Sequence, residues 1–307
     1  MMTLKTGVCI PTLNAGSAVE SVWAALEAQT CRPDEILIID SGSTDGTAEF
    51  FASRRGVVLA KIDRASFDHG GTRQLAVKMM STMDIVVFLT QDAVLADEDS
   101  LDKLVAEFED NSVAAAFGRQ LPRPGAGPVE AHARLFNYPE IGRVKSLDSI
   151  AEMGIKAAFI SNSFAAYRCS ALSLVGGFPS PTILGEDTFV AAKMILAGKK
   201  IVYCAESRVY HSHDYTVGQE FRRYFDTGVF HRRNRWIREQ FGGAEGEGMR
   251  FARSELRHLM HKAPFLIPSA LARTVAKFVG FRLGQLEGVI PLCLKRRLSM
   301  NRSYWNR

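Results

Sequence analysis

The sequence predicts an α/β protein in which helices flank a mixed, mainly parallel sheet, with a basic helical extension at the C-terminus. Two observations support this fold class. Short apolar runs alternate with amphipathic segments of helix length through the first 120 residues, as in parallel sheets covered on both faces. From about Val217 onward the pattern becomes helical and rich in Arg and Lys. We therefore expect a sheet domain over residues 1–215 and a helical region over 216–307.

The first 120 residues contain five expected strands, each a short apolar run rich in β-branched residues or alanine. Ser17 precedes an amphipathic segment at 18–29, and capping residue types at 43–45 open a second helical segment that ends at 54. The Pro- and Gly-rich segment 119–132 is expected to be a loop that leaves the sheet. The expected strands cover residues 6–12, 35–41, 57–62, 84–90 and 112–118.

The second half of the chain begins with a strand that leads into a helix, expected over 157–172. A long loop at 176–187 precedes a helix that opens with Glu186 and is ended by Gly198. A strand at 200–204 follows. Beyond it, we expect two basic helical stretches, at 217–241 and 250–290, on either side of the glycine-rich break GGAEGEG.

Composition limits the class of protein. A chain of 307 residues that is 47% hydrophobic is long enough to bury a large core as one domain with an appendage. Its five cysteines include no CxxC pair, which argues against a disulfide framework and a zinc ribbon and favours a reducing cytosol. The sequence has no run of about 18 uncharged apolar residues, and its N-terminal apolar segment is too short for a signal peptide. We expect a cytoplasmic protein that does not span a membrane.

Charge is distributed unevenly along the chain. From Arg222 to the end there are 18 Lys and Arg against 6 Asp and Glu, a net charge of +12, whereas the preceding residues hold 20 against 27, a net charge of −7. A basic extension of this kind suggests an anionic partner surface. Because the sequence has neither zinc-finger spacing nor an RNP-like aromatic motif, we expect no nucleic acid. We expect an anionic membrane instead, with the protein peripheral on the cytoplasmic face of the inner membrane.

One helical face of the extension carries apolar residues. Leu271, Val275, Phe278 and Val279 fall on this face, while the basic side chains of the same segment, Arg273, Lys277 and Arg282, point towards other directions. Such a pattern fits either packing on the sheet domain or lying at a membrane interface.

Ligands of open α/β sheets bind at the carboxyl ends of the strands, so the residues there are candidates for the site. The first strand ends in PTLNAG and the second in DSGSTDGT, with Asp40 at its tip. No GxGxxG follows the first strand and no GxxxxGK[ST] occurs, which excludes a dinucleotide fingerprint and a P-loop. Asp40 can accept a hydrogen bond from a ribose hydroxyl or a base N–H, although Asp-Ser-Gly is also ordinary turn chemistry.

Two further strand ends carry candidate groups. Gly70 and Gly71 precede a helix and can expose backbone N–H groups to an anion, and Arg73, one turn in, can reach a phosphate. Asp92 follows the buried run VVFLT, and a carboxylate there can hold Mg²⁺ or Mn²⁺ bridging a diphosphate. A surface turn is the alternative for Asp92.

The order of these segments resembles a known family. PTLN, then IIDSGSTDGT, then a strand that ends in an acidic motif are similar to the inverting nucleotide-sugar glycosyltransferases of family 2, which have the GT-A (Rossmann-like) fold. The segment GEDTFVAAKMILAGKKI resembles the Glu-Asp motif of that family, beside the acceptor site, and the resemblance covers about residues 5 to 215. Two more segments, FDHGGTRQLA and VYHSHDYTVGQEFRRYFDTG, resemble the rhamnosyltransferase subgroup, which implies dTDP-L-rhamnose as the donor.

The resemblance implies roles for individual residues. Asp187 would be the base that deprotonates the acceptor, with Glu186 on the acceptor side, although an acidic pair is also favoured at any helix N-terminus. Asp92 matches the last Asp of the DxD motif, with Gln91 in place of the first. The residues expected to bind the nucleotide sugar are Pro11, Thr12, Asn14, Asp40, Gly70, Arg73, Gln91 and Asp92.

His211 and His213 are expected to join Asp92 as ligands of Mg²⁺ or Mn²⁺. They lie two residues apart on an extended segment, so their side chains share a face, and neutral imidazole suits Mn²⁺. Paired surface histidines on an edge strand are the alternative.

The expected function is inverting transfer of a sugar, L-rhamnose from dTDP-L-rhamnose, onto a lipid-linked or oligosaccharide acceptor in cell-surface polysaccharide synthesis. A UDP-hexose donor is an alternative within the same fold. A nucleotidyltransferase would carry a glycine-rich basic first loop, which PTLNAGSAVE is not. A non-catalytic nucleic-acid-binding module would use the basic extension alone.

Overall fold

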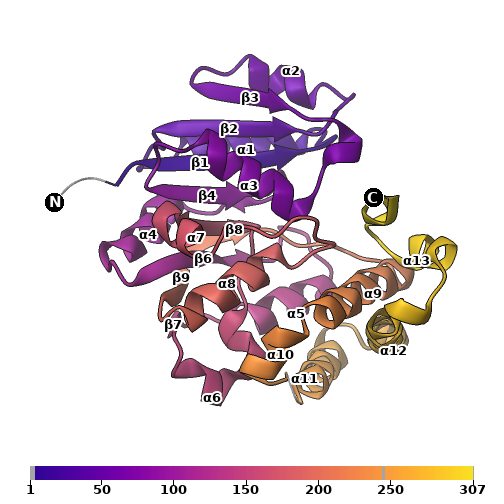
Figure 1. Ribbon diagram of the computed structural model, residues 1–307. Helices are drawn as coiled ribbons and strands as arrows, with labels where there is room; N and C mark the ends of the chain where they lie inside the picture. Colours follow the sequence, from indigo (N-terminus) through magenta and orange to yellow (C-terminus); the bar gives the residue numbers. More distant parts are fainter. Residues whose placement is uncertain (1–3, 244–245, 307) are drawn as a thin grey trace.

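A single twisted sheet forms the centre of the molecule (Figure 1). The computed structural model describes residues 4–243 and 246–306, and within these ranges nine strands form the sheet in the order β3-β2-β1-β4-β8-β6-β9-β5, with β7 also paired to β9. The strands are β1 (Thr6–Thr12), β2 (Glu35–Asp40), β3 (Val57–Lys61), β4 (Ile85–Leu89), β5 (Val94–Leu95), β6 (Val113–Leu121), β7 (Arg143–Lys145), β8 (Phe164–Arg168) and β9 (Lys200–Tyr210).

The sheet is mixed, as expected. Strands β1 to β4 pair in parallel, and β6 pairs in parallel with β9. Strand β8 lies antiparallel between β4 and β6 and joins the two parallel groups. Because β1, β2 and β4 run the same way, their carboxyl ends meet at one edge, where the candidate residues lie.

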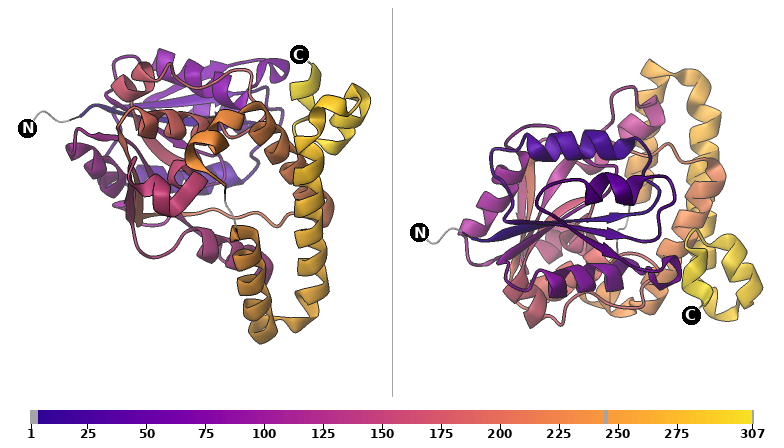
Figure 2. Two further views of the ribbon diagram at one scale, coloured as in Figure 1. Left: turned by 60° about the horizontal axis from the view of Figure 1, so that its bottom comes forward. Right: turned by 90° about the horizontal axis from the view of Figure 1, so that it is seen from above.

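Helices cover both faces of the sheet (Figure 2). One apolar core, around Trp23, Phe51 and Phe108, lies under α1, α2 and α4, and the other, around Phe88 and Tyr167, lies under α3, α7 and α8. The α-helices are α1 (Ala18–Glu27), α2 (Thr47–Ala52), α3 (His69–Met79), α4 (Ser100–Ala106), α5 (Pro128–Asn137), α6 (Ser149–Met153), α7 (Cys169–Leu174), α8 (Glu186–Leu196), α9 (Val217–Arg233), α10 (Arg235–Phe241), α11 (Glu247–Lys262), α12 (Ile267–Gln285) and α13 (Leu292–Leu298).

Two expectations about local structure are wrong. The segment 119–132 is not one loop, because β6 continues to Leu121 and α5 begins at Pro128, where the fixed φ of proline suits the first turn of a helix. The strand expected from residue 157 starts only at Phe164, after a 3₁₀ helix at Gly154–Ala158. The two shortest strands, β5 and β7, were not expected, since they carry too few residues to show a periodicity.

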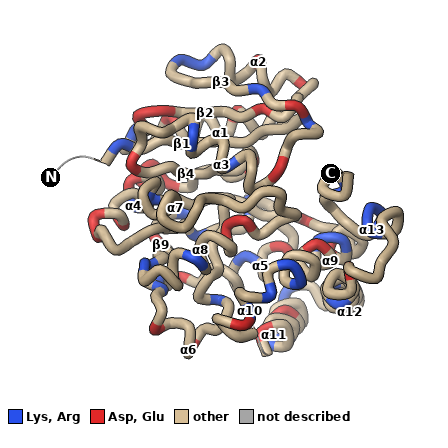
Figure 3. Tube along the Cα trace, viewed as in Figure 1, with Lys and Arg blue, Asp and Glu red and all other residues tan. Residues whose placement is uncertain are grey.

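All elements described after β9 are helical. Figure 2 shows α12 as a long rod along one side of the sheet domain, and Figure 3 shows Lys and Arg spread over α9, α12 and α13. None of the helices in the described ranges is at once long enough and apolar enough to cross a bilayer. Part of the glycine-rich break, Ala244 and Glu245, lies outside the described residues, and the domain boundary near residue 215 stays a prediction.

Helix α12 packs on α9 through glycine. A Cβ atom at Gly284 would lie 2.1 Å from the carbonyl oxygen of Phe225, and one at Gly280 would lie 2.3 Å from that of Phe221. Two backbones approach this closely only where no side chain separates them. Helix α12 is therefore fastened to α9, which in turn places Phe225, Val229 and Phe230 in the core that also contains Phe88 and Tyr167 of the sheet.

We expect Gly284→Ala to lower the free energy of unfolding by about 1–3 kcal/mol, because the new methyl group must push the two backbones apart. Gly218→Ala is the matched control, since nothing lies within 4 Å of a Cβ at that position of α9. The control should be neutral or stabilising by up to about 1 kcal/mol. Urea denaturation of both variants measures the difference, and equal stabilities would contradict the close packing.

Candidate active site

The ends of β1 and β2 are tied together by Asp40. Its carboxylate accepts hydrogen bonds from the Thr12 hydroxyl at 3.0 Å, the Ser43 hydroxyl at 2.5 Å, and the backbone N–H groups of Gly42 and Ser43. Burial opposes the charge, but these donors hold the pKa of Asp40 below its ordinary value. The sequence-predicted pair Thr12 and Asp40 is thus in contact, and Asp40 first stabilises the turn itself.

Hydrogen bonds join the loop after β1 to the loop after β2. Asn14 adopts a left-handed conformation with φ 46°, which asparagine tolerates better than most residues. Its side-chain oxygen accepts from the N–H of Thr44 at 2.8 Å, and its own N–H donates to the Ser43 hydroxyl at 2.9 Å. Pro11, Thr12, Asn14 and Asp40 therefore form one rigid edge.

Gln91 attaches this edge to the end of β4. Its side-chain oxygen accepts from the N–H of Leu13 at 2.7 Å, and its amide nitrogen donates to the carbonyl of Leu13 at 3.1 Å. These two hydrogen bonds resemble the pairing between neighbouring strands. A carboxylate could not make both of them, because it has no N–H to donate. The amide at the first position of the acidic motif thus has a structural purpose.

Asp92 lies beside both candidate histidines. The Nε2 of His211 is 3.4 Å from Asp92 Oδ1, and the Nδ1 of His213 is 3.8 Å from Oδ2. One ligand atom from each of the three residues lies within 4.8 Å of the others. Arg123 also contacts Asp92 at 2.9 Å in a charge-assisted pair. The alternative of surface histidines fails for His211, which is buried.

Hydrogen bonding fixes the tautomer of His211. The side-chain oxygen of Gln120 accepts from Arg134 at 2.5 Å and lies 2.9 Å from Nδ1 of His211. Because an arginine can only donate, the Gln120 atom that faces Arg134 and His211 must be the oxygen. An oxygen of this amide can only accept, so Nδ1 of His211 carries the proton. Burial lowers the pKa of His211, which keeps the ring neutral. The Nε2 lone pair then faces the Asp92 carboxylate.

A lone pair opposite a carboxylate is an unfavourable contact, which a cation bound between the two groups would relieve. The other histidine is neutral as well, because burial, aided by His211, lowers the pKa of His213 to about 4. Two imidazoles and one carboxylate form a donor set suited to Mn²⁺ or Mg²⁺, and Gln120 orients His211 from behind as outer hydrogen-bond partners do in metal sites. Asp92, His211 and His213 therefore fit a divalent cation.

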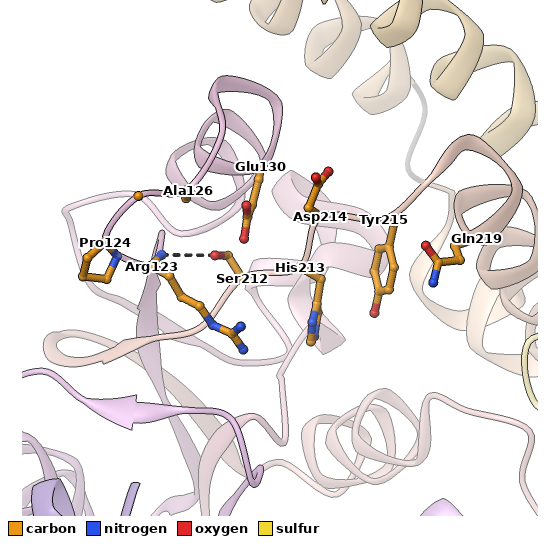
Figure 4. A pocket seen from close by; sticks show the side chains of 10 residues that line it. Arg123, Pro124, Ala126, Glu130, Ser212, His213, Asp214, Tyr215 and Gln219 are labelled. Carbon is orange, nitrogen blue, oxygen red and sulfur yellow. Dashed lines mark hydrogen bonds between the residues drawn. The ribbon is translucent and has the colours of Figure 1, made fainter. Parts of the chain in front are cut away.

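A cavity of about 440 Å³ opens beside His213. Figure 4 shows it between the loop that carries Arg123 and the segment that continues from Ser212 to Gln219, with the Ser212 hydroxyl accepting from the Arg123 N–H. The ring of Tyr215 stacks on His213 with centroids 5.1 Å apart. This stacking restrains the orientation of the His213 ring.

Glu186 and Asp187 begin α8 and are differently charged. Arg73 contacts Glu186 at 3.1 Å, and this guanidinium, against the effect of burial, lowers the pKa of Glu186. Burial and the neighbouring Glu186 carboxylate raise the pKa of Asp187 to about 7. Asp187 accepts N–H groups from Asn162 at 3.3 Å and Thr188 at 2.7 Å. A carboxyl with a pKa near neutrality is suited to proton transfer.

The residues expected to bind phosphate at the start of α3 make contacts within the protein, and Arg73 pairs with Glu186. Arg73 is buried and also donates to the carbonyl of His69 at 2.9 Å. A Cβ at Gly70 would lie 1.8 Å from the carbonyl oxygen of Pro179, so this glycine permits a loop to pass over the helix end. The N–H of Gly71 is taken by the Asp68 side chain at 2.7 Å. Gly70 and Arg73 are both buried in this structure, and their assignment as phosphate-binding residues stays a prediction.

A chain of hydrogen bonds joins the metal-type cluster, which consists of Asp92, His211 and His213, to the acidic pair Glu186 and Asp187. Gln120, which contacts His211, donates its amide N–H to the Ser161 hydroxyl at 2.9 Å. The next residue, Asn162, donates to Glu186 through its side chain at 2.9 Å and to Asp187 through its backbone. Asp92 and Asp187, 95 positions apart in the sequence, thus belong to one connected region.

Four residues that shape this region were not predicted from the sequence: Arg123, Arg134, Gln120 and Asn162. Three of them lie in or next to the segment taken as a loop, where no periodicity indicated a role. Gln120 at the end of β6, Arg123 just after it and Asn162 just before β8 lie at the same sheet edge as Asp92, and this position is the signal that could have indicated them.

Comparison with known proteins agrees with this architecture. The sequence model described as Glycosyl transferase family 2 matches residues 7–176, more than half of the chain. The O-antigen chain rhamnosyltransferase RfbN of Salmonella typhimurium is 51% identical over 303 residues, covering 99% of this chain and 96% of the relative. The O-antigen chain rhamnosyltransferase WbaN of Salmonella anatum is 50% identical over 298 residues, covering 97% and 94%.

Solved structures share the fold. The mannosyltransferase PcManGT of Pyrobaculum calidifontis, solved with GDP-Man and Mn²⁺, superposes with a TM-score of 0.58 at 18% identity and covers 100% of this chain and 86% of its own. TarS 1–349 of S. aureus, solved with UDP-GlcNAc, has a TM-score of 0.57 at 18% identity, with coverages of 97% and 84%. The mixed sheet flanked by helices is therefore that of a GT-A glycosyltransferase. The chain belongs to glycosyl transferase family 2.

Proposed function

We propose that the protein transfers L-rhamnose from dTDP-L-rhamnose, with inversion, to a lipid-linked saccharide in O-antigen-type polysaccharide synthesis. Identity of 51% over nearly the whole length of an O-antigen chain rhamnosyltransferase is the observation that carries the proposal. The pairing of a metal-type cluster with a carboxyl of raised pKa is consistent with single-displacement glycosyl transfer.

Asp187 acts as the general base. The acceptor oxygen attacks the anomeric carbon, the bond from that carbon to the diphosphate oxygen breaks, and the acceptor proton passes to Asp187. Its pKa of about 7 allows the carboxylate to be half populated near neutrality while still holding the proton well. Glu186 stays ionised beside Arg73, and its negative charge helps to keep the pKa of Asp187 raised.

Asp92, His211 and His213 hold the divalent cation of the donor complex. The cation, when bound, neutralises negative charge on the departing diphosphate. The protein adds the rigid edge formed by Thr12, Asn14 and the Asp40 turn, against which we place the nucleotide. Since the Asp40 carboxylate already accepts four hydrogen bonds, its contact with the base is a proposal that requires one of them to be exchanged.

A thermal-shift panel tests the donor. A ligand that binds only the folded state raises its melting temperature, so dTDP-L-rhamnose, UDP-glucose, UDP-galactose and GDP-mannose can be compared in Mn²⁺ or Mg²⁺. We expect the largest shift with dTDP-L-rhamnose. A larger shift with a UDP-hexose would overturn the donor assignment in favour of the alternative within the same fold.

The acceptor proposal includes an anionic membrane surface, which would place the protein on the cytoplasmic face of the inner membrane. One face of α12 packs on α9, whereas Leu271, Val275 and Phe278 on the opposite face are 48%, 61% and 62% exposed. Two basic residues of the helix serve internal contacts: Arg273 pairs with Asp214 and Lys277 with Glu220. We assign lipid contact to the apolar stripe and to the basic groups that remain exposed around it.

We expect Val275→Asp combined with Phe278→Asp to weaken binding to phosphatidylglycerol vesicles at least tenfold, since each buried side chain contributes roughly 1.5–3 kcal/mol. Cosedimentation measures the bound fraction. Leu174→Asp is the control, because Leu174 is 62% exposed on α7 of the sheet domain. Unchanged sedimentation of the double variant would show that α12 does not carry the membrane contact.

A further inference from the structure

We propose that Asn301, in the C-terminal segment, is a positioning residue of the active site that holds the loop leading into Glu186 and Asp187. This role rests on the proposed function of Asp187 as the base. It gives the end of the chain a part in catalysis that is separate from membrane contact.

Asn301 is itself anchored to α9. The Asp226 side chain on α9 is fully buried, and its Oδ2 accepts from the N–H groups of Met300 and Asn301 at 3.0 Å each and from the Asn301 side chain at 3.2 Å. A buried carboxylate with three donors on one oxygen is a specific, charge-assisted anchor. The contact fixes the C-terminal segment against α9.

From this anchor Asn301 reaches two elements of the site. Its side-chain N–H donates to the carbonyl of Ile183 at 3.0 Å, and its side-chain oxygen lies 3.4 Å from Nε2 of His69 at the start of α3. Ile183 stands three residues before Glu186. One amide therefore bridges α9, the loop before the acidic pair, and the helix that carries Arg73.

The loop has two other anchors. The N–H of Thr182 donates to the Asp68 side chain at 3.0 Å. Gly185, with φ 76°, packs so closely on the Phe230 ring that a Cβ would lie 2.9 Å from it. These contacts survive removal of the Asn301 side chain, so we expect a variant to keep its fold while the loop loses one of its restraints. Small displacements of a reacting group are costly, because about 1 Å can reduce a rate by roughly 100-fold.

The test uses Asn301→Ala and the near-isosteric Asn301→Asp, with Asn306→Ala as a matched control at an exposed position of the same segment. Hydrogen–deuterium exchange should become faster over residues 179–188 in both Asn301 variants and not in the control. The turnover number should fall at least about tenfold, while the thermal shift produced by dTDP with Mn²⁺ stays unchanged. If Asn301 had only a structural role, its substitution would lower the stability of the protein. It would not reduce the turnover number while leaving the dTDP thermal shift unchanged.

The pH profile gives a further readout. Glu186, Arg73, Tyr138 and Tyr167 surround Asp187, and burial, aided by the Glu186 carboxylate, raises its pKa to about 7. A loosened loop admits water, so the acidic limb of the rate profile should move to lower pH in the Asn301 variants. Unchanged exchange over 179–188 would overturn the role of Asn301 and leave the proposed function intact. Faster exchange together with full activity of Asp187→Asn would overturn the base assignment, and the positioning role with it.

Discussion

Asp187→Asn should reduce sugar transfer by about 10²–10⁴-fold, because the amide cannot take the acceptor proton. The substitution keeps the shape of the side chain and one oxygen, which can still accept the N–H of Thr188, while the longer contact with the N–H of Asn162 loses its acceptor. Binding of dTDP-L-rhamnose should therefore be nearly unchanged. Transfer of radiolabelled rhamnose into a lipid-linked saccharide fraction, together with the donor thermal shift, measures both quantities.

Asp148→Asn is the matched control, since Asp148 is exposed before α6 and makes no capping hydrogen bond through its side chain. It should retain full activity. In the wild-type enzyme, activity should fall as the pH drops below about 7, because Asp187 then becomes protonated. An Asp187→Asn variant with normal turnover would remove this residue from the mechanism.

Disruption of the metal-type cluster should have an equally large effect. We expect Asp92→Asn and His211→Ala each to weaken Mn²⁺ binding and to reduce transfer by at least about 100-fold, since each removes one of the three proposed ligands. Gln120→Leu should weaken Mn²⁺ binding by roughly 10–100-fold through loss of the His211 orientation. Electron paramagnetic resonance of free Mn²⁺ measures affinity without relying on activity.

His261→Ala on α11 is the control for the histidine substitution, because its side chain is exposed. Treatment with EDTA should abolish transfer, and added Mn²⁺ should restore it. Full transfer in the chelator would show that the cluster is not a functional metal site and that Arg123 beside Asp92 supplies the positive charge instead.

The parallel part of the fold was predictable because β1 to β4 are long apolar runs bounded by turn residues. The antiparallel strand β8 was only half located: its four apolar residues follow a polar Ser-Asn-Ser that broke the expected longer strand. The position of α12 could not be predicted, because its close packing depends on Gly280 and Gly284 meeting α9, a contact between segments that a single sequence does not reveal.

The site shows the same division. Asp92, His211 and His213 could be proposed from strand ends and from a spacing of two, and they do lie together. Arg73 looked like a phosphate ligand at a helix start, but it is buried against Glu186, a partner 113 positions away in the sequence. Gln120 and Asn301 act through long-range hydrogen bonds, for which the local sequence has no pattern.

Anomalous diffraction from crystals grown with dTDP and Mn²⁺ tests the central claim most directly. The account predicts one manganese peak bounded by Asp92, His211 and His213, with the diphosphate against it and the Asp187 carboxyl facing the same crevice. Manganese bound elsewhere, or a diphosphate separated from Asp187 by the body of the protein, would contradict it.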